Sequence, residues 1–129
     1  MASIAPLAGL AQRVRRLSLR SDLAQTDGEI SLYYRRACLA AAEERYDDAM
    51  IFCSKAVALR SAHLPTRLLI AQIQDRGLGD VDAALESYGK VISLAGYDAS
   101  NPYCAAARAA IDRLARGEPV KPDGEGRPG

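Results

Sequence analysis

The chain has 129 residues, of which 49% are apolar and 26% are charged, and its net charge is +1. This length fits one domain with a core of its own, and the near-zero charge argues against a protein that binds nucleic acid by charge alone. Three cysteines without a CxxC pair argue against a disulfide framework and favour a reducing compartment, which we expect to be the cytoplasm.

Residues 1–25 are predicted to form a basic amphipathic helix. Its apolar stripe, at steps of three and four residues, consists of Leu7, Leu10, Val14 and Leu17. The flanking arginines, which form a candidate surface for an anionic partner, are Arg13, Arg16 and Arg20. Four roles stay open: a cap on the fold, a surface for anionic lipid or an acidic protein, pairing with another copy, and a mitochondrial presequence. No stretch is apolar enough to span a membrane, so membrane contact is expected to be peripheral at most.

Thr26-Asp27-Gly28-Glu29 has the pattern of a capping box, in which Thr and Glu satisfy the first free amides of a helix. It therefore predicts a break and a new helix over 27–44. The apolar residues of that helix are Ile30, Tyr33, Tyr34, Ala37, Cys38 and Ala41.

Three further helices are expected over 47–61, 65–76 and 81–95. Asp47 and Asp48 favour the first turn of a helix, where the helix dipole attracts negative charge. Pro65 suits position N1 of the next helix, which Gly77-Leu78-Gly79 should end. Asp80 is the expected N-cap of the third, and Gly96 its C-terminal stop.

Asn101-Pro102 predicts a last helix over 101–116, with Asn101 as N-cap. Its apolar side is typical of a capping helix for the domain, which we place at residues 26–116. From Gly117 the chain is rich in Gly and Pro with almost no aliphatic residues, so the tail 117–129 is expected to be disordered.

Two segments of the chain are nearly the same. YDDAMIFCSKAVAL at 46–59 and VDAALESYGKVISL at 81–94 align at an offset of 35 residues. The identical pairs are Asp47 with Asp82, Ala49 with Ala84, Lys55 with Lys90 and Leu59 with Leu94. A period of this length indicates a helical repeat protein, whose helix pairs bury their apolar faces by stacking.

The pattern resembles the tetratricopeptide repeat (TPR) family, whose repeats are pairs of antiparallel helices, A and B. The matching residues of the first repeat, about 30–63, are Tyr33, Ala37, Ala49, Cys53 and Ala56. Those of the second, about 65–96, are Ala71, Ala84, Tyr88 and Val91. The resemblance implies an all-α stack of helix pairs with an N-terminal helix and a C-terminal capping helix. An irregular helical bundle is the alternative.

The sequence departs from the family pattern at four points. Cys53 replaces an aromatic residue, Arg36 stands where Leu is usual, and Arg67 stands where a large apolar residue belongs. The period is 35 rather than 34, and we place the extra residue within Gly77–Asp80.

The sequence displays no catalytic or cofactor site. His63 is the only histidine and is expected to be solvated or to cap a helix, so nucleophilic catalysis lacks a base. The cysteines lack the paired spacing of zinc ligands. We therefore expect no enzyme activity, no metal and no cofactor.

The resemblance implies a protein-interaction module that holds a peptide or amphipathic helix in a groove lined by the A helices. The groove residues it implies are Tyr34, Cys38, Ala41, Leu68, Gln72 and Asp75. This set is mostly apolar and lacks the Lys and Asn with which some family members clamp a terminal carboxylate. The alternative is a self-assembling or membrane-peripheral scaffold subunit that uses the basic N-terminal helix.

Overall fold

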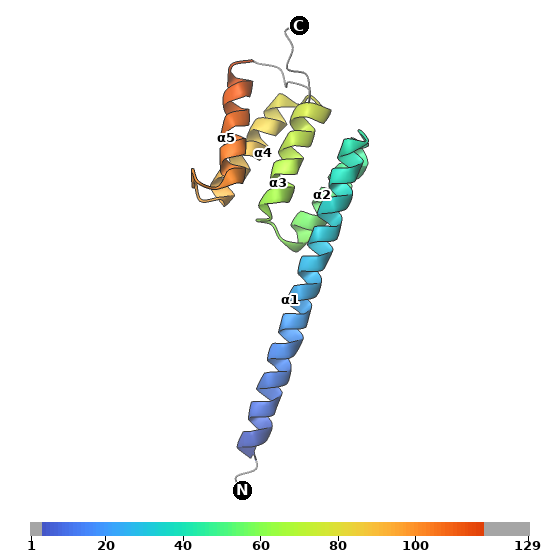
Figure 1. Ribbon diagram of the computed structural model, residues 1–129, viewed down its shortest axis with the longest axis vertical. Coiled ribbons are helices and arrows are strands. Elements are labelled where there is room, and N and C mark those ends of the chain that lie inside the picture. The colour runs from blue at the N-terminus through green and yellow to red at the C-terminus, as the bar shows by residue number, and fades with distance from the viewer. Residues whose placement is uncertain (1–3, 118–129) are drawn as a thin grey trace.

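The protein is all-α in the part of the chain that the structure describes. The computed structural model covers residues 4–117, with side chains from residue 22 onward. The helices are α1 (Ile4–Ala42), α2 (Tyr46–Leu59), α3 (Leu64–Gln72), the π-helical turn η1 (Ile73–Gly77), α4 (Val81–Leu94) and α5 (Pro102–Ala115). Figure 1 shows α2–α5 stacked on one side of the C-terminal part of α1. The expected tail lies outside the described residues from position 118 onward.

The first helix pair is α1 against α2. Its core holds small side chains, and Ala37, Ala49 and Cys53 are fully buried. Small residues at these positions let the two backbones approach closely. Two exposed bases cover aromatic rings on the rim of the pair: Arg36 lies 6.0 Å from the ring centroid of Phe52, and Lys55 lies 5.6 Å from that of Tyr33. Arg36 therefore packs through a cation–π contact where the family has Leu.

The second helix pair, α3 against α4, repeats the first and is closed by α5. Its buried core consists of Ala71, Ala84, Tyr88, Val91 and Ala107. Ala84 is fully buried, as is the matching Ala49 of the first pair. The pairs are joined through α3, because Ile73 at its end belongs to the core of the first pair. The two segments that are similar in sequence therefore also pack in a similar way.

The break expected at Thr26–Glu29 is wrong, because α1 runs without interruption from Ile4 to Ala42. The Thr26 hydroxyl donates to the Asp22 carbonyl, one turn back, instead of capping a new helix. Gly28 causes no break either, since a helix interior tolerates glycine at a loss of about 1 kcal/mol relative to alanine. The N-terminal helix and the first A helix are therefore one element.

The N-terminal part of α1 extends away from the rest of the protein (Figure 1). Among the side chains described from residue 22 onward Ile30 is the first that is buried, and Asp27 pairs with Arg60 at the end of α2. Turns before Asp27 continue past α2 without covering the domain. Of the four roles left open for this segment, a cap on the fold is therefore not seen in the single chain.

The extra residue of the second repeat lies inside a helix and not in the loop where we expected it. Both repeats have linkers of the same length, 43–45 and 78–80. Before the bulge the repeats match at an offset of 34, as Ala37 and Ala71 do; after it they match at 35, as Ala49 and Ala84 do. The π-helical turn η1 between these positions takes up the additional residue.

The ends of the helices follow the expected capping chemistry at three of the predicted sites. Asp80 accepts a hydrogen bond from the amide of Ala83, and Asn101 accepts from Tyr103 and Cys104. Gly96 ends α4 with a φ of +68°. The C-terminal end of α3–η1 falls at Gly77, as predicted. Pro65 occupies the second helical position rather than the first, since α3 begins at Leu64.

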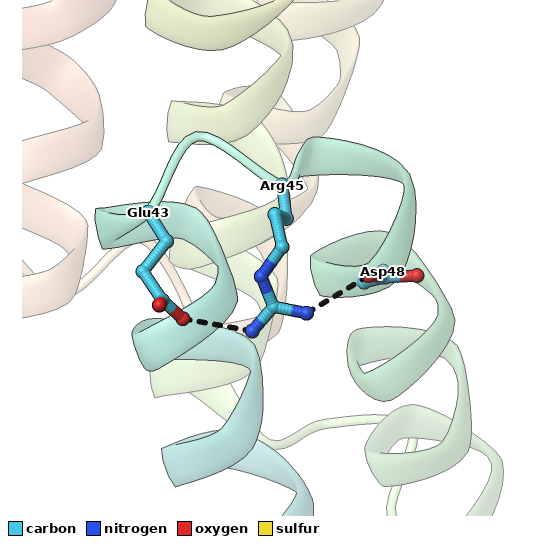
Figure 2. Close-up of polar contacts among 3 residues, drawn as sticks. All are labelled: Glu43, Arg45 and Asp48. Atoms are coloured by element: carbon cyan, nitrogen blue, oxygen red, sulfur yellow. Dashed lines mark hydrogen bonds and ion pairs between the residues drawn. The ribbon is translucent and has the colours of Figure 1, made fainter.

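The α1–α2 turn is held by charged side chains instead of a cap. Arg45, the N-cap residue of α2, makes no capping bond and pairs with Glu43 at 2.8 Å and with Asp48 at 2.9 Å, as Figure 2 shows. Hydrogen bonds to these two carboxylates raise the pKa of Arg45. All three side chains are exposed, so these pairs orient the turn and add little stability.

Candidate partner-binding groove

Three helices occupy equivalent A positions and line one face of the stack. Ala37 of α1, Ala71 of α3 and Ala107 of α5 are all fully buried, and each faces the B helix of its own or the preceding pair. On α1 and α3, the residues three positions before and one position after these alanines are expected to border the candidate groove. Helix α5, which the sequence suggested only as a cap, therefore acts as a third A helix.

Tyr34 and Cys38 are the α1 residues expected to line the candidate groove. Both are half-buried, and the Tyr34 ring meets the His63 ring edge-on, with centroids 5.9 Å apart. Burial, followed by a hydrogen bond with Cys38, raises the pKa of Tyr34 to about 12. The tyrosine thus presents a neutral, partly desolvated aromatic surface.

The remaining apolar and amide residues of the expected set are also half-buried. Ala41 packs against the core of the first pair, and Leu68 packs against that of the second. Gln72 borders a hollow of about 340 Å³ between α3 and α5. The residues that line this hollow are Gln72, Arg76, Tyr88, Ala106, Ala109, Ala110, Arg113 and Arg116. The structure therefore brings five of the six expected residues to half-exposed positions.

Asp75 does not line the groove as expected, because it is buried in an internal polar cluster. Its exposed fraction is 8%, and its Oδ2 accepts hydrogen bonds from the Tyr88 hydroxyl at 2.9 Å and from the Arg113 guanidinium. The π-helical turn places Asp75 where the first repeat has the buried Ala40. A carboxylate satisfied in this way holds α3, α4 and α5 together and is not open to a partner.

The α3–α5 end of the groove is basic, which the sequence reasoning missed. Arg76, Arg113 and Arg116 all border the hollow there. Arg113 also bonds to Asp75, so its charge is partly balanced from within. Arg76 lies far from Arg113 and Arg116 in the sequence, so no local pattern predicts that they meet. The one sequence feature that points to α5 as an A helix is the spacing of Tyr103 and Ala107, which equals that of Tyr33 and Ala37.

His63 is neither solvated nor a backbone cap, contrary to expectation. It is half-buried at the start of α3, makes no capping bond, and its Nδ1 lies 2.7 Å from the hydroxyl of the buried Thr66. Burial, together with the nearby Arg60, lowers the pKa of His63. It therefore links the groove residue Tyr34 to the first turn of α3.

The cysteines differ in access. Cys53 and Cys104 are fully buried, and burial raises the pKa of the Cys53 thiol to about 12. Cys38 is half-buried at the groove. No group of three metal-ligating side chains occurs among the described residues.

A larger hollow, about 600 Å³, lies between α3 and α4 and does not belong to the groove. It is bordered by side chains of mixed charge, among them Arg67, Glu86 and Lys90, and is bridged by a hydrogen bond from Ser87 to Gln74. Its residues lie on a different side of α3 from Leu68 and Gln72. This lining of mixed charge favours no single class of ligand.

The basic surface predicted at Arg13, Arg16 and Arg20 lies on α1, but the side chains of these residues fall outside the described part. Their backbone is helical, so the arginines stand along the extended part of α1. None of the helices within residues 4–117 is both long and apolar enough to cross a membrane.

Comparison with known proteins identifies the first helix pair. The tetratricopeptide repeat family model matches residues 30–63, the segment in which α1 packs on α2. Residues 30–63 form a tetratricopeptide repeat. No curated protein and no solved structure matches the chain.

The TPR assignment agrees with the packing around it. The second pair, α3 and α4, buries Ala71, Ala84 and Tyr88 at the positions that correspond to Ala37, Ala49 and Cys53 of the TPR. Helical repeats of this kind stack to form concave surfaces that bind proteins. A TPR at residues 30–63 therefore indicates a protein–protein interaction module.

Proposed function

We propose that the groove between α1, α3 and α5 binds a peptide or an amphipathic helix of a partner protein. The observation that carries this proposal is the half-buried Tyr34, whose ring meets that of His63 edge-on. Aromatic side chains held rigidly at a half-exposed position are typical anchors of protein interfaces. Leu68 and Cys38 continue the apolar surface beside this ring.

The two ends of the groove favour a partner segment with two kinds of side chain. The Tyr34–Leu68 end accommodates apolar side chains, as for the buried face of an amphipathic helix. The α3–α5 end, bordered by the exposed Arg76, attracts a carboxylate. A partner segment that carries both an apolar anchor and an acidic residue suits the two ends.

Affinity capture with groove variants tests this function. Tyr34→Glu and Leu68→Glu place charge in the apolar end and should each abolish capture of the same partner. Ser54→Glu, on the exposed outer face of α2, is the matched control and should retain it. Circular dichroism and thermal unfolding establish that each variant is folded. A partner retained by both folded groove variants contradicts the proposal.

The extended α1 supports a second candidate function, a scaffold or assembly subunit that docks through residues 1–25. Among the described side chains the buried core begins at Ile30, so we expect the core to remain intact when these residues are deleted. The truncated chain should keep its helical content and its unfolding temperature while it loses self-association or binding to anionic vesicles. A truncated chain that no longer folds would show that the segment is needed by the domain itself.

A further inference from the structure

A short basic motif surrounds Ser18 in the N-terminal part of α1. Its sequence, Arg15-Arg16-Leu17-Ser18-Leu19, places arginines three and two residues before the serine and an apolar residue directly after it. Basophilic serine kinases recognise this arrangement, because carboxylates in their substrate clefts bind the two guanidinium groups. Among the serines and threonines of the chain, Ser18 alone has arginine at both of these positions.

The part of α1 that carries this motif stands apart from the other helices. Figure 1 shows the turns before Asp27 extending beyond α2–α5. Among the side chains described from residue 22 onward, the buried core begins at Ile30, about three turns of 3.6 residues after Ser18. A kinase can therefore approach this segment without displacing the helix pairs.

Phosphorylation also requires the helix to open around Ser18, since serine kinases bind their substrate segments in an extended conformation. Opening these turns breaks backbone hydrogen bonds within α1 but exposes none of the buried side chains that the structure describes. A helical segment without tertiary packing is marginal in water. Local opening there therefore costs much less than unfolding of the domain.

We propose that Ser18 is a phosphorylation site for a basophilic serine kinase. The Ser18 hydroxyl attacks the γ-phosphorus of ATP, and the bond from that phosphorus to the bridging oxygen breaks. ADP leaves with that oxygen, and the hydroxyl proton passes to a carboxylate of the kinase. The product carries a phosphate of about two negative charges at position 18.

This phosphate changes the charge of the surface that contains Arg13, Arg16 and Arg20. Residues 1–20 hold four arginines and no acid, so the phosphate cancels roughly half of their positive charge. Basic amphipathic helices bind anionic membranes through such charges and are released by phosphorylation. Phosphorylation of Ser18 should therefore release residues 1–25 from anionic lipid. This consequence, unlike the site itself, rests on the second candidate function.

Treatment of the full chain with ATP and the cyclic-AMP-dependent protein kinase, with the site mapped by mass spectrometry, tests the assignment. The chain should take up phosphate at Ser18, and Ser18→Ala should abolish this uptake. Ser21→Ala is the matched control, because Ser21 lies in the same stretch but lacks the two arginines, and it should behave as the wild type. Arg15→Gln with Arg16→Gln should lower kcat/KM about tenfold or more, since two charge-assisted contacts are lost.

Two outcomes would overturn the assignment. One is a wild-type chain that takes up no phosphate at Ser18, and the other is an unchanged kcat/KM for the variant that lacks Arg15 and Arg16. Circular dichroism establishes that each variant is folded, which we expect because the substituted residues precede the described core.

Cosedimentation with vesicles of phosphatidylcholine and phosphatidylserine tests the consequence. The phosphorylated chain should bind with a dissociation constant about tenfold higher or more than the unmodified chain. Equal binding of the two forms would contradict the release. An unmodified chain that binds no vesicles would show that the lipid form of the second candidate function is wrong, whereas the site stands or falls on the mapping alone.

Discussion

At the scale of single residues, the polar cluster of Asp75, Tyr88 and Arg113 distinguishes the second helix pair from the first. Where the first pair buries Ala40 and Cys53, the second buries a carboxylate and a phenol that bond to each other. Burial, followed by the bond to Asp75, raises the pKa of Tyr88, so the phenol stays a donor at neutral pH. The cluster ties α5 to α3 and α4 and thereby forms the floor of the basic end of the groove.

Removing the phenol oxygen should destabilise the fold. Tyr88→Phe deletes one hydrogen bond to a buried charge, and the free energy of unfolding should fall by about 1.5–3 kcal/mol in urea. Tyr97→Phe is the control, because Tyr97 is 67% exposed, and it should change the value by less than about 0.5 kcal/mol. Equal effects of the two substitutions would contradict the role of the cluster.

His63 should make stability depend on pH near neutrality. Its pKa in the folded chain is lowered from 6.5, chiefly by burial, so below about pH 6.5 the unfolded chain takes up a proton that the folded chain resists. Stability is therefore full above pH 6.5 and is lost as pH falls toward the folded-state pKa. Urea unfolding at pH 7.5 and 5.5 should show this loss for the wild type.

The matched variant for this experiment is His63→Gln, which has no titrating group at that position. Its stability should change less between the two pH values, because His63 is the only histidine in the chain. If the wild type and His63→Gln show the same pH dependence, the linkage to His63 is wrong.

At the scale of elements, the π-helical turn η1 determines how the two helix pairs meet. It carries the extra residue, turns Asp75 inward and brings Gly77 against Tyr46 at the start of α2. A Cβ on Gly77 would lie 2.6 Å from Tyr46 Cε1, with two more ring atoms within 2.8 Å. Glycine is therefore required at this position by close packing between the two pairs.

Two glycine-to-alanine substitutions should have opposite effects. Gly77→Ala must displace the Tyr46 ring, and overpacking of this kind lowers stability by about 1–3 kcal/mol. Gly89→Ala, within α4, meets no atom within 4 Å and should raise stability by about 1 kcal/mol through helix propensity. Thermal and urea unfolding measure both. A stabilising Gly77→Ala would show that the approach of Tyr46 is not tight.

Much of this element-level description could be predicted from the sequence, and the failures have physical causes. Asp80, Asn101 and Gly96 determine helix ends through residues next to them in the sequence, so these helix ends could be predicted. Thr26 and Gly28 were misread because a capping box also fits inside a helix when the Thr hydroxyl bonds one turn back. The Asp75 cluster joins three helices, and no local sequence pattern predicts such a contact.

At the scale of the whole molecule, two stacked helix pairs with α5 form one body, and α1 extends from it. Of the groove, the residues on α1 and α3 were predicted from the TPR resemblance. The contribution of α5 was not, because it depends on how the last helix packs on α4.

The central claim, that a partner occupies the groove, is tested most directly by alkylation of Cys38. In the free protein Cys38 is half-buried and should react with N-ethylmaleimide, whereas the fully buried Cys53 and Cys104 should react only on unfolding. With the captured partner bound, the rate at Cys38 should fall about tenfold or more as the groove is covered. An unchanged rate at Cys38 in the complex would contradict the account.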